Sequence, residues 1–241
     1  MRGIILSGGS ATRLRPCTKV TSKQLLPVYN RPMIYYPLNT LVKAGIKEIL
    51  IIISPERAGD YLNLLGSGRQ FGIKLTYEIQ DKPRGLAEAF IIGENFIDND
   101  NVTMILGDNI FEDDFTDDIK NFQSGARVFV KKVPDPERFG VVEINDQNQV
   151  ISIEEKPLQP KSDLAVTGLY IYDQRVIEVA KQVQPSARGE LEIVDLHNWY
   201  LQRHELEVSI VNGEWIDAGT FDSLLRAQIL ARDRLQNKLI I

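Results

Sequence analysis

The chain has 241 residues, of which 43% are hydrophobic and 25% charged, as in an ordinary globular protein with one substantial core. Its net charge of −5 argues against a broad electrostatic grip on nucleic acid or an anionic membrane, and its single cysteine, Cys17, excludes an internal disulfide and a cysteine-based zinc cluster. The apolar run after Arg2 is too short for a signal peptide and no stretch approaches membrane-spanning length, so we expect a cytoplasmic protein without nucleic-acid or membrane partners.

The first half of the chain alternates predicted strands with predicted helices. Short aliphatic or β-branched runs bounded by turn residues predict strands at residues 2–6, 48–53, 74–78 and 102–106. Helical patterns lie between them, at residues 32–44 with a proline at the start, from residue 54 where a serine can cap, and at about 85–96. This repetition predicts a parallel sheet with helices on both faces.

The second half is predicted to be richer in extended segments. Strands are expected at residues 128–132, 140–145, 149–154, 164–172 and 207–211, with a hairpin turn at 146–148. Helices are expected at residues 174–183, 190–203 and about 221–235. No linker or repeat interrupts the chain, so we expect one domain, residues 1–241, whose halves (about 1–125 and about 126–241) share a mixed, mainly parallel central sheet in a Rossmann-like α/β fold.

A loop with two glycines follows the first predicted strand. Gly8 and Gly9 lack Cβ atoms, so backbone N–H groups there can close on an anion, and Arg13, Arg15 and Lys23 follow with positive charge. The loop contains neither the Gly-Lys-Ser/Thr of the P-loop nor the Gly-x-Gly-x-x-Gly of dinucleotide-binding folds. The sequence therefore predicts a phosphate-binding loop of another type.

Further polar residues are expected on the same edge of the sheet. Open parallel sheets bind ligands at the carboxyl ends of their strands, where the loop, Gln80 and Asp108 should meet. The amides of Gln24 and Gln80 can present paired donors and acceptors to a pyrimidine, although Gln80 in an exposed turn is the alternative. Asp108 can hold a hard divalent cation, unless it only caps a turn.

Two motifs carry a family resemblance. Residues 8–14 (Gly-Gly-Ser-Ala-Thr-Arg-Leu), followed by residues 22–27 (Ser-Lys-Gln-Leu-Leu-Pro), resemble the signature of the sugar-phosphate nucleotidylyltransferases. Residues 23–37 narrow the resemblance to the glucose-1-phosphate thymidylyltransferases. Further blocks in the family's order extend it over essentially the whole chain, at residues 83–87, 106–109, 135–143, 154–157, 165–172, 185–193 and 217–220.

The resemblance implies the nucleotide-diphospho-sugar transferase-like fold, with a nucleotide-binding first half and a sugar-phosphate-binding second half. It also implies an enzyme that transfers a thymidylyl group from dTTP to glucose 1-phosphate, giving dTDP-glucose and pyrophosphate by direct in-line displacement. No side chain needs to act as a covalent nucleophile, because an oxygen of the sugar phosphate is itself the nucleophile. A Mg2+ cofactor, a homo-oligomer and a place in dTDP-sugar and polysaccharide biosynthesis are implied as well.

Roles for individual residues come from the same resemblance. The implied catalytic residues are Arg13, Lys23, Asp108, Lys156 and Asp217, with Asp108 and Asp217 as the metal ligands. The implied nucleotide site comprises Leu6, Gly8, Gly9, Arg13, Lys23, Gln24, Gln80, Gly85 and Asp108. The implied sugar-phosphate site comprises Gly140, Glu155, Lys156, Val166, Tyr170 and Arg188, and of these Val166 and Tyr170 are equally plausible as core residues.

The sequence departs from the family pattern at a few positions. Ala11 replaces a frequent glycine, Phe139 stands where a tyrosine is frequent, and Arg84 and Glu88 differ from residues common near the base pocket. The chain resembles the short form of the family, so we do not expect the second, regulatory nucleotide site of the longer members. A catalytic or metal-binding role is not expected for either His197 or His204, since both lie in or just after one predicted helix.

Three other functions are weighed against this one. The nearest is the same chemistry with UTP, CTP or another sugar 1-phosphate. A metal-dependent glycosyltransferase would more typically show Asp-x-Asp, which Asp108-Asn109-Ile110 is not. A non-catalytic nucleotide-sugar sensor is disfavoured, because the charged residues of the implied site are all present.

Overall fold

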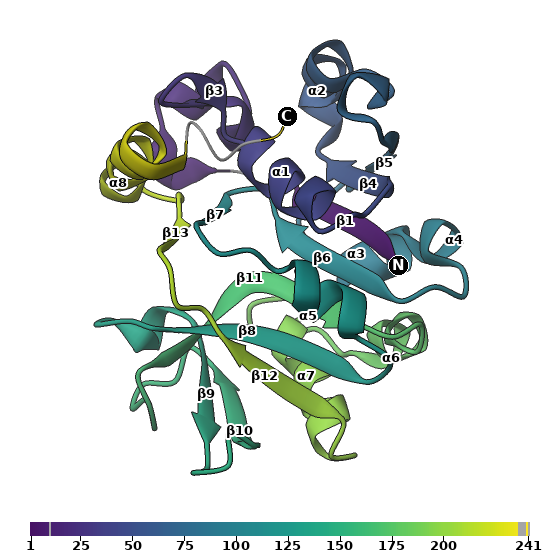
Figure 1. Ribbon diagram of the computed structural model, residues 1–241, viewed down its shortest axis with the longest axis vertical. Helices are drawn as coiled ribbons and strands as arrows, with labels where there is room; N and C mark the ends of the chain where they lie inside the picture. The colour runs from purple at the N-terminus through teal and green to yellow at the C-terminus, as the bar shows by residue number, and fades with distance from the viewer. Residues whose placement is uncertain (10, 236–239, 241) are drawn as a thin grey trace.

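The computed structural model describes residues 1–9, 11–235 and 240. Within them a nine-stranded mixed sheet has the order β10-β9-β11-β6-β1-β4-β5, with β8 paired to β11 and β12 paired to β8 (Figure 1). The strands are β1 (Arg2–Ser7), β4 (Glu48–Ile53), β5 (Lys74–Ile79), β6 (Val102–Leu106), β8 (Ala126–Lys132), β9 (Gly140–Ile144), β10 (Val150–Glu155), β11 (Leu164–Tyr172) and β12 (Leu206–Ile210). The predicted mixed α/β fold is confirmed.

The first half contributes the parallel part of the sheet. β1 pairs in parallel with β4 on one side and with β6 on the other, and β4 pairs in parallel with β5. β11 then runs antiparallel to β6 and joins the first half to the second. Because β6, β1, β4 and β5 point the same way, their carboxyl ends lie along one edge of the sheet.

Successive side chains of the strands point alternately into two hydrophobic cores, one on each face of the sheet. Ile4 and Leu6 pack with α3 (Glu88–Ile92), α4 (Glu94–Ile97), α6 (Val176–Gln182) and α7 (Ile193–Leu201). Ile5 and the alternate residues of β4 pack with α1 (Tyr35–Lys43), α2 (Ala58–Leu65) and α5 (Thr116–Asn121) on the opposite face. Apolar residues at every strand position are typical of a parallel sheet covered on both faces.

Two small two-stranded sheets lie apart from the large sheet in the described part of the chain. β2 (Pro27–Val28) pairs with β3 (Arg31–Pro32), and β7 (Asn109–Phe111) pairs antiparallel with β13 (Trp215–Asp217). The last helix, α8 (Phe221–Leu230), begins at a capping box between Thr220 and Ser223 and continues as a π-helical turn, Ala231–Leu235. α8 closes a small third core over β2, β7 and β13.

Several predicted helix boundaries were wrong. Pro32 pairs in β3, so the first helix begins only at Tyr35. The helix expected from residue 54 begins with the 3-10 turn Pro55–Arg57, and Ser54 makes no side-chain capping bond. The helix expected over 85–96 breaks at Gly93 into α3 and α4. Further 3-10 turns span Thr12–Leu14, Cys17–Lys19, Lys23–Leu25, Arg69–Phe71 and Pro136–Arg138.

No helix in the described part of the chain is both long enough and apolar enough to cross a bilayer.

Candidate functional site

Two carboxylates from distant parts of the sequence meet at the carboxyl edge of the parallel strands. Asp108 follows β6 directly, and the pairing of β13 with β7 places Asp217 opposite Asn109. The backbone N–H of Ala218 donates a 2.9 Å hydrogen bond to the carbonyl of Asp108. The local fold therefore holds both carboxylates side by side, at the same edge of the sheet as the glycine loop that follows β1.

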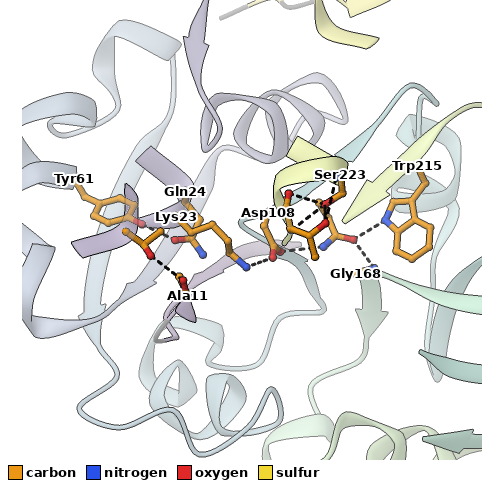
Figure 2. Close-up of polar contacts among 11 residues, drawn as sticks. Ala11, Lys23, Gln24, Tyr61, Asp108, Gly168, Trp215 and Ser223 are labelled. Carbon is orange, nitrogen blue, oxygen red and sulfur yellow. Dashed lines mark hydrogen bonds and ion pairs between the residues drawn. The ribbon is translucent and has the colours of Figure 1, made fainter. Parts of the chain in front are cut away.

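Lys23 forms an ion pair with one of these carboxylates. Its ammonium donates to Asp108 Oδ2 (Figure 2), while Asn109 Nδ2 donates to Asp108 Oδ1 at 3.1 Å. Burial, the largest single influence, would raise the pKa of Asp108, but the charge of Lys23 together with the hydrogen bonds that Asp108 accepts lowers that pKa overall. Burial would likewise lower the pKa of Lys23, but the charge of Asp108, its hydrogen bond and the charge of Asp217 together raise that pKa. Both groups are therefore charged at neutral pH.

The pKa of Asp217 is shifted in the opposite direction to that of Asp108. Burial, and then the neighbouring charge of Asp108, raise its pKa to about 7, and Lys23 and Arg13 only partly oppose them. Arg13 lies close by, since a Cβ added to Gly219 would come within 2.8 Å of Arg13 Nη2 and 3.0 Å of Asp217 Oδ1. Two buried like charges that repel each other form a donor set that a divalent cation would stabilise.

The donor set suits a hard divalent cation such as Mg2+. Both donors are hard carboxylate oxygens, and Mg2+ is usually held by one or two carboxylates, with water and substrate phosphate completing its shell. Among the described residues, no group of three or more His, Cys, Asp or Glu residues could hold a metal ion by itself. The arrangement therefore fits a cation that is shared with a phosphate substrate rather than a fully protein-bound metal.

Asn109 ties this centre to the second half of the chain. Its Oδ1 accepts from Gly168 N at 3.0 Å and from Trp215 Nε1 at 2.6 Å (Figure 2). Gly168 lies in an irregular stretch of β11, where the register with β8 shifts between Val166 and Tyr170. Sequence reasoning did not assign Asn109 or Trp215, although each lies within two residues of a predicted metal ligand.

A pocket of about 200 Å³ opens beside Asp108. Of the residues predicted to bind nucleotide, all except Arg13 line it, namely Leu6, Gly8, Gly9, Lys23, Gln24, Gln80, Gly85 and Asp108. It adjoins a larger hollow of about 540 Å³ that includes Gly9, Ala11, Arg15 and Lys23. Ala11 itself adopts the left-handed conformation (φ 46°, ψ 37°) that its alanine side chain disfavours.

Gly85 on the rim of this pocket is in tight contact with the backbone of Leu191. Its φ is +109°, and a Cβ there would lie 2.5 Å from the Leu191 nitrogen. The two segments are hydrogen-bonded on either side of this contact, from Leu191 N to Arg84 O (2.7 Å) and from Ala87 N to Leu191 O (3.2 Å). Any side chain at position 85 must therefore separate these segments.

Replacing Gly85 with alanine is expected to weaken binding of the predicted nucleotide at least tenfold and to lower the free energy of unfolding by about 2 kcal/mol or more, because backbone strain adds to the overlap with Leu191. Nucleotide titration and urea unfolding measure the two effects. Gly72→Ala is the matched control, since Gly72 also has a positive φ (+67°) but nothing within 4 Å of an added Cβ. Equal effects of the two substitutions would contradict the role given to the Leu191 contact.

A second cavity, of about 410 Å³, lies on the other side of the two carboxylates. Arg13, Asp108 and Asp217 form part of its lining. All the residues predicted to bind the sugar phosphate also line it, namely Gly140, Glu155, Lys156, Val166, Tyr170 and Arg188. Phe139, the departure noted above, packs against Trp215 with ring centroids 5.3 Å apart and gives the cavity an apolar wall.

Two of the cations that line this cavity, Arg188 and Lys156, are held by carboxylates. Arg188 Nη2 lies 2.9 Å from both oxygens of Glu192 and 3.3 Å from Glu155 Oε1, and Lys156 Nζ lies 3.0 Å from the same Glu155 oxygen. These pairs are half-exposed, so an entering phosphate can compete for the cations at little cost. Glu192 was not assigned from the sequence, because only the folded loop shows it beside Arg188.

His197 lines the back of the same cavity. It is fully buried, neither ring nitrogen has a hydrogen-bond partner among the described residues, and its ring stacks on Tyr172 at 5.9 Å. Burial lowers its pKa from 6.5 to about 3, so the imidazole is neutral at physiological pH.

The unfolding free energy should therefore depend on pH through His197. Between about pH 6.5 and 3 the unfolded chain binds a proton that the folded chain excludes, so stability falls as pH falls, by about 2 kcal/mol at pH 5. We expect His197→Phe to lose about 2 kcal/mol less than wild type between pH 7.5 and 5 in urea unfolding. His204→Asn, at an exposed position, is the control and should follow wild type. Parallel profiles for His197→Phe and wild type would contradict the prediction.

Known proteins resemble the chain over nearly its whole length. The nucleotidyl transferase family model matches residues 2–234. The chain is 56% identical over 233 residues to a glucose-1-phosphate thymidylyltransferase of Neisseria meningitidis, covering 94% of this chain and 81% of the relative. It is 49% identical to one from Mycobacterium tuberculosis, covering 96% and 82% of the two chains.

Solved structures give the same picture. A Bacillus anthracis protein, described provisionally as a glucose-1-phosphate thymidylyltransferase and crystallised with sucrose, is similar with a TM-score of 0.92 and 50% identity, covering 97% of this chain and 96% of that one. A UDP-glucose pyrophosphorylase in complex with UDP-glucose has a TM-score of 0.83 at 24% identity, covering 96% and 98%. The second likeness shows the fold alone.

Proposed function

The chain belongs to the nucleotidyl transferase family and, within it, to the glucose-1-phosphate thymidylyltransferases, and from this membership we propose the reaction of its site. The enzyme transfers a thymidylyl group from dTTP to glucose 1-phosphate and releases pyrophosphate, forming dTDP-glucose. One observation carries the proposal. The Lys23–Asp108 pair, with Asp217 beside it, lies between a pocket lined by Gln24 and Gln80 and a larger cavity lined by Lys156 and Arg188.

Catalysis here is mainly positioning and neutralisation of charge. A sugar phosphate and a nucleoside triphosphate repel each other, and the attacking phosphate oxygen must nevertheless approach the α-phosphorus. We assign Lys23 and Arg13 to the triphosphate, since both lie at the carboxylate centre, with Lys156 and Arg188 orienting the sugar phosphate across the cavity. The planar guanidinium of Arg188 suits paired phosphate oxygens. The sugar phosphate itself is the nucleophile.

We propose that Asp108 and Asp217 hold Mg2+. A bound Mg2+ would neutralise phosphate charge and act as a Lewis acid. The raised pKa of Asp217 supports this assignment, because a bound cation would offset the burial and the repulsion by Asp108 that raise it. Lys23 is paired with the Asp108 carboxylate, so this ion pair would have to rearrange for Asp108 to hold Mg2+.

Pyrophosphate release tests the proposed reaction. Purified protein with Mg2+ and glucose 1-phosphate is compared across dTTP, UTP, CTP, ATP and GTP. Release fastest with dTTP is the expected result. Fastest release with another nucleotide would change the proposed substrate, and no release with any of them would exclude the proposed reaction with glucose 1-phosphate.

We propose that the enzyme is a homo-oligomer of the cytoplasm, the compartment that supplies nucleoside triphosphates. Support for self-association comes from α8, where Phe221, Leu225 and Ile229 are 48%, 56% and 45% exposed at four-residue spacing. We expect Leu225→Lys to shift the wild-type oligomer toward monomer in light scattering. Arg226→Lys on the same helix is the control. A wild-type monomer, or an unchanged oligomer in the lysine variant, would contradict this.

A further inference from the structure

The side-chain amide of Gln80 has a defined orientation in the nucleotide pocket. Its Nε2 donates to Glu88 Oε2 at 2.9 Å and lies 3.5 Å from the carbonyl of Gly85. Its Oε1 faces the glycine loop, close to where a Cβ of Gly8 would be. Gln80 is only 5% exposed and lines the pocket, so this oxygen is the part of the amide that the pocket can use.

Glu88 is what enforces this orientation. An ionised carboxylate only accepts hydrogen bonds, so the amide must turn its nitrogen toward Glu88 and its oxygen away. The Glu88 side chain is 14% exposed, and Arg84 Nε lies 3.8 Å from its other oxygen. A flipped amide would set two oxygens against each other in a largely buried place, which costs the energy of an unmade hydrogen bond and adds repulsion.

The second glutamine of the pocket shows the complementary arrangement. Tyr61 Oη donates to Gln24 Oε1 at 3.2 Å (Figure 2). Burial raises the pKa of Tyr61 to about 12, so the hydroxyl keeps its proton. The Gln24 oxygen is therefore occupied by the hydrogen bond from Tyr61, and the amide N–H groups of Gln24 remain available to the pocket. Gln80 thus offers an acceptor and Gln24 a donor.

We propose that Glu88 is a positioning residue for base selection, which fixes the Gln80 oxygen as an acceptor and so admits pyrimidines that carry a hydrogen on N3. Thymine and uracil present N3–H beside a carbonyl, matching an acceptor and a donor. Cytosine presents an unprotonated N3, whose lone pair would face the Gln80 oxygen. This inference rests on the proposed function and extends it, because a site built to accept a hydrogen bond rejects the analogue that lacks the donor.

The test compares kcat/KM for dTTP and dCTP in wild type, Glu88→Met and Glu88→Gln. Methionine removes the acceptor at similar length, and we expect the dTTP/dCTP ratio to fall at least tenfold. Glutamine can accept from Gln80 but can also donate to it, so it should enforce the orientation less strictly than glutamate, and its ratio should lie between those of wild type and Glu88→Met. Thermal unfolding of each variant checks the fold, and Glu88→Ser, with the same expected loss, replaces Glu88→Met if the latter does not fold.

Three results would overturn the inference. They are a wild-type enzyme that does not discriminate against dCTP, a Glu88→Met ratio equal to wild type, and a Glu88→Gln ratio as low as that of Glu88→Met. The proposed function fails differently, through a wild-type enzyme with no dTTP turnover at all. The two failures are therefore distinguishable in one set of assays.

Discussion

Replacing Lys23 with methionine is expected to lower kcat by about a thousandfold or more. The ammonium of Lys23 is the positive charge nearest the buried Asp108, and it lies between the nucleotide pocket and the hollow next to it. Without it, charge that builds up on the α-phosphate as the bonds change is neutralised less. Steady-state rates at saturating dTTP and glucose 1-phosphate measure the effect, which should appear in kcat rather than in KM alone.

The same substitution also leaves Asp108 buried without its partner. Unpairing a buried charge costs about 3 kcal/mol or more of stability, so rates are compared well below the unfolding temperature of each variant. Lys47→Met is the matched control, because Lys47 is exposed and lies beyond the amino end of β4, at the opposite edge of the sheet. A Lys23→Met enzyme within tenfold of wild type would remove Lys23 from the chemistry.

Asp108→Asn is expected to lower kcat by about a thousandfold as well, for a different reason. Asparagine keeps the shape of the side chain but removes the negative charge that we assign to Mg2+ and that pairs with Lys23. The pKa of Asp217 should fall at the same time, since the Asp108 charge is one of the two main causes that raise it. The measurement is kcat across a wide range of Mg2+ concentrations.

Excess Mg2+ should not restore the Asp108→Asn enzyme, because one of only two protein carboxylates is lost. Asp114→Asn, which neutralises a surface carboxylate paired with Lys43, is the control and should match wild type. Full recovery of the Asp108→Asn variant at high Mg2+ would show that Asp108 acts only through metal affinity. Wild-type activity of the Asp108→Asn enzyme without excess Mg2+ would show that Asp108 has no role in the site.

The parallel half of the fold is predictable because each strand carries its own signal. The run of isoleucines in β4 matches its predicted range, since a strand of a parallel sheet that is buried on both faces is apolar almost throughout. β7 and β13 were missed because three residues carry no periodicity, and their pairing depends on contacts between distant segments. Yet this pairing is what brings Asp217 to Asp108.

The residues of the candidate site likewise divide into those that the sequence identifies and those that only the fold reveals. Residues within short motifs, such as Lys23 and Asp108, were identified through the family resemblance and lie together at the edge of the sheet. Asn109 and Glu192 were not assigned, because each acquires its role from partners that the chain brings in from elsewhere, Gly168 and Arg188 among them. From the sequence, Glu88 was identified only as a departure from the family pattern, and its contact with Gln80 is visible only in the folded chain.

Phosphorus NMR of one reaction mixture tests the central claim, that the sugar phosphate attacks dTTP directly between the two cavities. With enzyme, Mg2+, dTTP and glucose 1-phosphate, we predict a nucleoside diphosphate sugar and pyrophosphate in equal amounts, and neither product when either substrate is omitted. Pyrophosphate released without glucose 1-phosphate would indicate a nucleotidylated enzyme or hydrolysis, and would contradict direct transfer.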